Sequence, residues 1–195
     1  KIIGILKKNS RAKIVLNIQG CLTERLDWYN EKKLIKDIKS LAENGQIEFV
    51  ETAKFHPILP FLPEKEIKRQ IELNHQTNKY YFGKAYQPKG FFFPEMACDK
   101  KSIRLIKQLG YKWIILDEFS HQGKFGQVKF DRTYQFEGLK IIFRNRKLSF
   151  LLASQKAISS KKYLQILKNN LESNQFLVTA NDGEIFGHRY HGREK

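Results

Sequence analysis

Charged side chains follow the apolar segments of this sequence at the points where those segments end. The polar residues in question are His56, Glu95, Asp117, Glu118, Arg144, Arg146, Asn181 and Asp182. A pair of carboxylates can cleave a glycosidic bond, because one attacks the anomeric carbon while the other protonates the leaving oxygen. These residue types therefore indicate acid–base or glycosyl chemistry, provided that the fold brings the segment ends together.

Each position also has a simpler explanation, because the loops that follow strands are polar. Asp182 and Gly183 form a common turn pair, and Glu95 could lie near a helix N-terminus, where the helix dipole favours an acid. His56 precedes Pro57 and could be a rim histidine without a chemical role. The repetition of the pattern at five strand ends favours a site, because parallel strands of one sheet end on the same side.

Other kinds of active site find little support in the sequence. The close histidine pair, His188 and His191, has no apolar helix beneath it, so we expect neither a metal site nor a cofactor. The chain has no G-x-S-x-G and no G-x-x-x-x-G-K-[ST] motif, which argues against serine hydrolases and phosphate-loop enzymes. Cys21 and Cys98 are expected to be small buried apolar residues rather than reagents.

The strands that must position these residues are indicated by apolar runs and alternation. Strands are predicted over residues 13–20, 47–52, 90–93, 111–116, 139–143 and 176–180. Residues 121–137 contain Gly123, Gly126 and many polar side chains, which predicts a loop or a short hairpin there.

Helices are predicted between most of these strands. Leu34, Ile35, Ile38 and Leu41 form one apolar stripe, which ends at the helix-terminating pair Asn44-Gly45. A second stripe, Ile67 and Ile71, lies between Pro63 and Gly83. A third, formed by Ile103, Ile106 and Leu109, lies between Asp99 and Gly110. A fourth follows Ser160 and consists of Leu164, Leu167 and Leu171. Strand and helix alternation predicts an α/β fold with a mostly parallel sheet, either open and doubly wound or closed into a β/α barrel.

Length and composition narrow the class of protein. The 195 residues, 41% of them hydrophobic, are enough for one domain with a sizeable core, and we expect a single domain over residues 1–195. The longest apolar runs are only a few residues, so no membrane span is expected. Two cysteines allow at most one disulfide, which fits a reducing compartment and a cytoplasmic location.

The net charge of +16 raises the question of a polyanionic partner such as nucleic acid. The excess is mostly lysine scattered over helix faces, and no dense arginine run, zinc-knuckle spacing or RNA-recognition signature accompanies it. We therefore expect no nucleic-acid partner. A basic nucleic-acid-binding module without catalysis is kept as an alternative.

Three segments carry a family resemblance. They are IEFVETAKFHPILPFL at 47–62, GFFFPEMACDKKSIRLIKQLGYKWIILDE at 90–118 and FLVTANDGEIFGHR at 176–189. In this order they resemble glycoside hydrolase family 57, the retaining α-glucan-active enzymes that include amylases, branching enzymes and 4-α-glucanotransferases. The resemblance implies a (β/α)7 pseudo-TIM barrel that binds an α-glucan or maltooligosaccharide across the carboxyl face of its strands. It leaves hydrolase and transferase activity both open.

The resemblance also implies roles for individual residues. Glu95 in FFPEMA matches the family's catalytic nucleophile, and Asp182 in NDGEIFG matches its general acid/base. Phe92 stands where the family often has a tryptophan, although Phe91 to Phe93 would otherwise be taken as core. The substrate-contacting positions implied in this way are His56, Phe92, Asp117, Glu118, Arg144, Arg146, Glu184 and His188.

Two departures from the family pattern concern the ends of the chain. The family opens with a strand bearing an HQP motif, which nothing before Lys13 supplies, and it continues beyond the acid/base segment. We therefore expect an internal fragment that lacks the first barrel strand and the C-terminal part, with turnover expected of the longer enzyme. The alternative enzyme class is a polysaccharide deacetylase on a similar barrel, which would need a metal held by aspartate and histidines.

Overall fold

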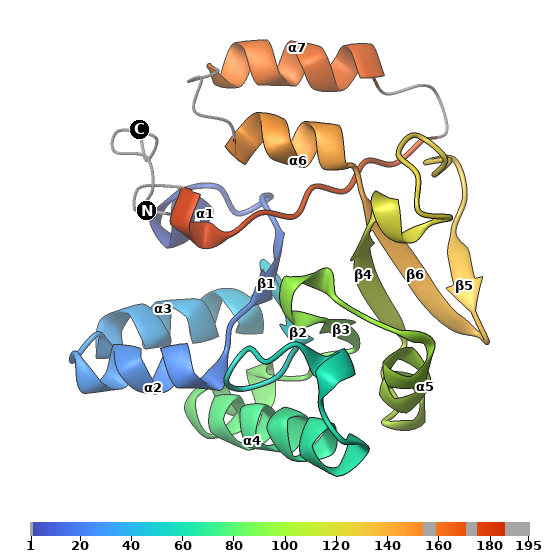
Figure 1. The fold of residues 1–195 in the computed structure, drawn as a ribbon. Coiled ribbons are helices and arrows are strands. Elements are labelled where there is room, and N and C mark those ends of the chain that lie inside the picture. The colour runs from blue at the N-terminus through green and yellow to red at the C-terminus, as the bar shows by residue number, and fades with distance from the viewer. Residues whose placement is uncertain (1, 154–158, 171–174, 186–195) are drawn as a thin grey trace. The chain divides into compact units, whose positions relative to one another are not determined.

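The computed structural model describes residues 2–153, 159–170 and 175–185, and a six-stranded, mainly parallel β-sheet organises them (Figure 1). Hydrogen bonds join the strands in the order β1-β2-β3-β4-β6-β5. This arrangement confirms the predicted α/β class, while the described strands run from one sheet edge to the other without closing a barrel. The chain divides into two compact units, residues 1–115 with 137–139, and residues 116–136 with 140–195.

The first unit holds the parallel strands. They are β1 (Ile14–Asn17), β2 (Ile47–Glu51), β3 (Gly90–Phe92) and β4 (Trp113–Asp117), the last of which runs on into the second unit. Ile14 pairs with Ile47, Val50 with Gly90, and Gly90 in turn with Trp113, each in parallel register. The carboxyl ends of these strands therefore lie on the same side of the sheet.

Helices connect these strands, as parallel pairing requires. They are α2 (Gly20–Trp28), α3 (Lys32–Glu43), α4 (Glu64–Phe82) and α5 (Lys100–Gln108), while α1 (Ile2–Lys8) precedes β1, and single 3₁₀ turns lie at Leu59–Phe61, Gly83–Ala85 and Pro94–Met96. The predictions that became α3, α4 and α5 are confirmed. Helices α1 and α2 were not predicted, because neither carries a long apolar stripe. Helix α2 packs against both α3 and α4 (Figure 1).

Local chemistry explains where the predicted helices begin and end. The Asp99 side chain accepts a hydrogen bond from the Ser102 backbone N–H at 2.7 Å, while the Ser102 hydroxyl accepts from the Asp99 N–H at 3.0 Å. This reciprocal cap satisfies two backbone donors at the start of α5. Gly110, with φ +93°, follows the other end of α5, where a left-handed conformation favours glycine.

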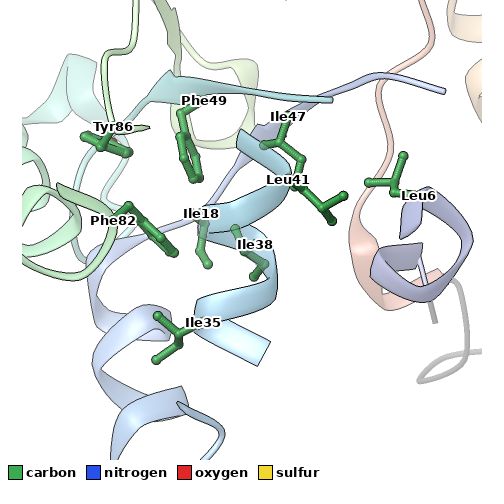
Figure 2. Packing of buried hydrophobic residues seen from close by; sticks show 9 residues of the cluster. All are labelled: Leu6, Ile18, Ile35, Ile38, Leu41, Ile47, Phe49, Phe82 and Tyr86. Carbon is green, nitrogen blue, oxygen red and sulfur yellow. The ribbon is translucent and has the colours of Figure 1, made fainter. Parts of the chain in front are cut away.

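The core of the first unit lies between the sheet and α3. Ile35, Ile38 and Leu41 lie along one buried face of α3 (Figure 2). They pack with Leu6, Ile18, Ile47, Phe49, Phe82 and Tyr86, all of which are buried. The apolar stripe read from the sequence is therefore the face that this helix buries, and burial of each such side chain contributes about 1.5–3 kcal/mol.

The pairing of β3 with β4 depends on a glycine. A Cβ atom added to Gly90 would overlap the Trp113 indole, far inside the range of real Cβ contacts. Because real Cβ contacts are never that short, any side chain at position 90 would displace either the tryptophan or the strand. The absence of a side chain at Gly90 thus lets β3 approach β4 and carry the residues that follow it.

The second unit contains a hairpin and the remaining helices. Its elements are β5 (Tyr134–Phe136), β6 (Leu139–Arg144) from residue 140 onward, α6 (Arg146–Ala153) and α7 (Ser160–Asn170), with 3₁₀ turns at Glu118–Ser120 and Gly183–Ile185. Glu137 and Gly138 connect β5 to β6, and both have positive φ, as a two-residue hairpin turn requires. The predicted excursion over residues 121–137 is therefore in part a hairpin.

One predicted strand is wrong. Residues 176–180 form no strand, although the Phe176 N–H donates to the Phe130 carbonyl and the Val178 carbonyl accepts from the Asn145 N–H. Apolar and β-branched residues favour extended backbone, but a strand also needs a neighbouring ladder, which these two isolated bonds do not supply. Helix α6 was not predicted. Leu171, the last residue of the α7 stripe, lies outside the described residues.

Candidate active site

Glu95 lies immediately beyond β3, in the first unit. Pro94 ends the strand, and Glu95 sits in the turn Pro94–Met96 with φ +56°, a left-handed conformation that is rare for residues with a side chain. Met96 adopts φ +54° as well. The Glu95 side chain is 69% exposed, so the turn presents its carboxylate to solvent at the carboxyl end of the sheet. Backbone strain of this kind often marks functional positions.

His56 reaches the same carboxylate from the segment after β2. Its Nε2 lies 3.0 Å from Oε1 of Glu95, and its Nδ1 lies 2.9 Å from Nε2 of Gln19. His56 also has positive φ, +55°. The structure therefore brings together two predicted site residues, Glu95 and His56, and adds Gln19, which the sequence reading missed. Gln19 lies two residues beyond β1, and no spacing signal distinguishes it from an ordinary helix-start residue.

Phe92 is the last residue of β3 and differs from its neighbours in burial. Phe91 and Phe93 are fully buried and pack edge to face with ring centroids 5.0 Å apart. Phe92, on the opposite side of the strand, is only partly buried. The two flanking rings therefore belong to the core, and Phe92 is the member of the triplet that is accessible to a ligand.

A buried polar network surrounds Glu51, the last residue of β2. It was not predicted from the sequence. Glu51 is fully buried, and its Oε1 accepts hydrogen bonds from Asn74 Nδ2 at 2.5 Å and from the Tyr86 hydroxyl at 2.8 Å. Nδ1 of His75 lies 2.9 Å from the other carboxylate oxygen. Burial, followed by the negative charge of Glu51, raises the pKa of Tyr86 far above its usual range, so the phenol stays a donor.

In the second unit, Asp117 forms the centre of a charged cluster. Its Oδ2 accepts from Arg144 Nε at 2.8 Å and from Arg146 Nη1 at 3.0 Å, and Oδ1 accepts from the Phe119 N–H at 3.0 Å. Arg144 also donates to the Ala180 carbonyl at 3.1 Å, which ties the end of β6 to the segment before Asp182. The sequence placed these charges at strand ends, and the structure pairs them with each other.

Burial of the Asp117 carboxyl opposes ionisation, but the Phe119 N–H and the two guanidinium groups outweigh it and hold the pKa of Asp117 below its ordinary value. A carboxyl with a lowered pKa in the folded state stabilises the fold above its unfolded-state pKa. That contribution is lost as the pH falls through the folded-state pKa. The cluster is therefore expected to contribute stability at neutral pH and to lose it in acid.

Asp117→Asn is expected to lower the free energy of unfolding by about 2 kcal/mol at neutral pH, because two partly buried guanidinium groups lose their anion. The difference from the wild type should shrink at an acid pH, because the wild-type carboxyl itself becomes protonated once the pH falls through its lowered folded-state pKa. Urea unfolding at the two pH values measures both effects. Asp131→Asn, which removes an exposed pair with Arg132, is the matched control and should change little. An equal loss for Asp117→Asn at both pH values would contradict this account.

Glu118 is also engaged within the second unit. One carboxylate oxygen accepts from the Arg146 N–H at 3.0 Å, and the other accepts from the Gly126 N–H at 3.3 Å. The Arg146 guanidinium lies over the rings of Phe125 and Phe150, at 5.2 and 4.6 Å from their centroids. Glu118 and Asp117 thus organise the loops of this unit, and direct substrate contact by either residue stays a prediction.

Asp182 lies just before the turn Gly183–Ile185 in the second unit. Its carbonyl accepts from the Ile185 N–H at 3.3 Å, and Ile185 is buried, so this short turn is anchored. The side chains of Asp182 and Glu184 are exposed. Asn181 donates to the Ser149 carbonyl at 2.8 Å, which fixes the segment from one side. His188 lies outside the described residues. Asp182 and Glu95 belong to different units, and each is placed within its own unit.

The described residues show neither a metal site nor a membrane-spanning helix. Within residues 2–153, 159–170 and 175–185, no group of three His, Cys, Asp or Glu side chains is arranged to hold a metal ion. No helix of this described part is long and apolar enough to span a membrane. Cys21 and Cys98 are both free thiols, and burial followed by the charge of Asp99 raises the pKa of Cys98 to about 11. Cys98 is therefore a thiol rather than a thiolate at neutral pH, and both cysteines are only partly buried, not fully buried as predicted.

The fold and the site place this chain in the class of α/β proteins that carry acidic groups beyond the carboxyl ends of parallel strands. The solved 4-α-glucanotransferase of Thermococcus litoralis has this fold, with a TM-score of 0.80 and 22% identity over 98% of this chain and 30% of that one. The chain belongs to glycosyl hydrolase family 57, whose family model matches residues 2–194. The predicted family membership is confirmed.

Curated relatives carry two kinds of name. An α-amylase of Pyrococcus horikoshii is 26% identical over 188 residues, which are 93% of this chain and 29% of that protein. A 4-α-glucanotransferase of Thermococcus litoralis is 24% identical over 190 residues, 94% of this chain and 28% of that protein. The chain thus spans less than a third of the length of these relatives.

Proposed function

We propose that this chain forms part of the catalytic domain of an α-glucan-active enzyme, in which Glu95 is the nucleophile and Asp182 the general acid/base. The observation that carries the proposal is the placement of Glu95. Its carboxylate is exposed on a strained turn at the carboxyl end of β3 and is held by His56. Family membership and the names of the relatives, α-amylase and 4-α-glucanotransferase, support an α-glucan or maltooligosaccharide as substrate.

The reaction proceeds as a double displacement. In the first step a Glu95 oxygen bonds to the anomeric carbon, the glycosidic C–O bond breaks, and Asp182 gives its proton to the departing oxygen. In the second step the Asp182 carboxylate takes a proton from water or from a sugar hydroxyl. The resulting oxygen attacks the anomeric carbon and releases Glu95, so the configuration is retained and both residues return to their starting state.

The surrounding residues orient the substrate and the catalytic groups. Phe92 offers an accessible ring on which a sugar face can stack, and Glu184 and His188 follow the acid/base as acceptors and donors for sugar hydroxyls. Arg144 links the end of β6 to the Ala180 carbonyl, two residues before Asp182, and so positions the acid/base segment. The two free thiols support a cytoplasmic location.

Product analysis of the complete protein tests the proposed function. Incubation with maltoheptaose should give shorter maltooligosaccharides if water is the acceptor, and both shorter and longer ones if a sugar is the acceptor. Proton NMR at early times should show newly formed reducing ends in the α configuration. Activity is expected to survive dialysis against EDTA, since neither carboxylate needs a metal. Products of β configuration, or deacetylation with no change in chain length, would overturn the proposal.

A further inference from the structure

Gln19 is the third member of a hydrogen-bonded chain that crosses three strand ends of the first unit. It follows β1, His56 follows β2 and Glu95 follows β3, and the two bonds that join them measure 2.9 and 3.0 Å. The partners in the first bond are separated by 37 residues, and those in the second by 39. Side chains from the segments after three neighbouring strands are therefore linked to one another.

The chemistry of the amide determines where the histidine carries its proton. As the amide is oriented, Nε2 of Gln19 faces Nδ1 of His56, and an amide nitrogen can only donate. Nδ1 must therefore accept, so the neutral ring carries its hydrogen on Nε2. That hydrogen points at Oε1 of Glu95, which accepts it. A histidine with the opposite tautomer would direct a lone pair at the carboxylate and repel it.

Hydrogen bonds and close packing fix the backbone at Gln19 and Gly20. The Gly20 N–H donates to Oδ1 of the buried Asn74 at 2.6 Å, and a Cβ atom at Gly20 would lie 3.0 Å from Thr77. The Gln19 carbonyl accepts from the Leu22 N–H at 2.9 Å, which starts α2. The other two members of the chain are strained, because His56 and Glu95 both have positive φ.

We propose that Gln19 is a positioning residue: by donating to Nδ1 it sets the tautomer of His56 and thereby the orientation of the Glu95 carboxylate. The assignment to catalysis rests on the proposed function, in which Glu95 is the nucleophile. With Oε1 held by His56, Oε2 is the oxygen that attacks the anomeric carbon. Gln19 itself touches neither substrate nor the reacting atoms.

Two substitutions of nearly equal size separate donation from packing. Gln19→Met keeps the length of the side chain and removes the donor, whereas Gln19→Glu replaces the donor by an acceptor. Gln76→Met, on the exposed face of α4, is the matched control. All variants are made in the complete protein labelled with ¹⁵N-histidine, and a His56→Gln variant assigns the ring signals of His56 among those of the other histidines.

The ring nitrogen spectra report the tautomer directly. In spectra of the neutral ring, recorded at a pH above which the His56 signals no longer change, the wild type and Gln76→Met should show the hydrogen on Nε2. Gln19→Met should show a mixture of tautomers, and Gln19→Glu should place a proton on Nδ1, opposite the new carboxylate. A wild-type ring protonated on Nδ1, or identical ring spectra in all variants, would overturn the proposal whatever the protein catalyses.

Kinetics test the link to catalysis. Gln19→Met is expected to lower kcat on maltoheptaose roughly tenfold, the equivalent of one hydrogen bond, with KM nearly unchanged. A change confined to KM, or none, would contradict the positioning role even if the tautomer shifts. If Glu95→Gln keeps full activity, the proposed function fails instead, while the spectra still decide whether Gln19 sets the His56 tautomer.

Discussion

Replacing Glu95 by glutamine is expected to lower turnover of a maltooligosaccharide by at least about 10⁴-fold, because an amide cannot form the glycosyl ester. Glutamine keeps the size of the side chain, and its carbonyl oxygen can still accept from the His56 ring. Because the side chain is 69% exposed, little stability should be lost. The measurement is kcat in the complete protein, together with a thermal melt to verify folding.

Glu48→Gln provides the control for the loss of a carboxylate in the same unit. Glu48 is exposed in β2, so its replacement should leave turnover within about twofold of the wild type. Near-wild-type turnover in Glu95→Gln would remove Glu95 from the nucleophile role. A parallel loss in Glu48→Gln would mean that the effect is not specific to the proposed site.

Anion rescue sharpens the test of the nucleophile. In Glu95→Gly, azide can enter the space of the missing carboxylate and attack the anomeric carbon from the same face. The expected product from an activated α-glucosyl substrate is therefore the β-glucosyl azide. The α-anomer would show that another group still forms the covalent intermediate.

Replacing Asp182 by alanine is expected to lower turnover of maltoheptaose by about 10²–10⁴-fold, the usual contribution of a general acid. The loss should be much smaller for α-glucosyl fluoride, because fluoride departs without protonation. Azide should then intercept the glycosyl–enzyme and give the α-glucosyl azide, the opposite anomer to that expected from Glu95→Gly. Steady-state rates on the two substrates and product NMR measure these effects.

Asp131→Ala serves as the control for the Asp182 variant, because Asp131 is an exposed acid in the same unit, paired with Arg132. It should retain turnover on both substrates. An Asp182→Ala variant that loses the same factor on maltoheptaose and on the fluoride would not be missing a proton donor. That result would assign Asp182 to binding or folding and leave the acid/base role to another residue.

The long helices and the central strands were predictable because their signals are local. Apolar residues repeat every three or four positions in α3 and α5, and Asp99, Gly45 and Gly110 mark ends by their own capping or turn chemistry. Pro94 stops β3 for a local reason as well, since proline cannot donate a ladder hydrogen bond. The position of Glu95 after a strand follows directly from that stop.

Weak local signals explain why some short extended segments were predicted wrongly. The segment 176–180 looks like a strand, but its two isolated backbone bonds do not form a ladder. Conversely, β5 is only three residues long but does form a strand. It pairs with β6 because Glu137 and Gly138 adopt the positive φ values of a tight hairpin turn. Whether a short extended segment becomes a strand depends on a neighbour, and neighbours are set by the rest of the fold.

Local sequence patterns were sufficient to predict the α/β class, the family and the placement of Glu95, Asp117 and Arg144 at segment ends, because periodicity, turn residues and motifs act over a few positions. The hydrogen-bond and ion-pair partners of the site residues, in contrast, follow from the tertiary structure. The folded chain brings Gln19 to His56 and pairs Asp117 with two arginines. It also buries Glu51 against the amide of Asn74 in α4. Hydrogen bonds between residues tens of positions apart depend on where the whole chain places them, which no local pattern encodes.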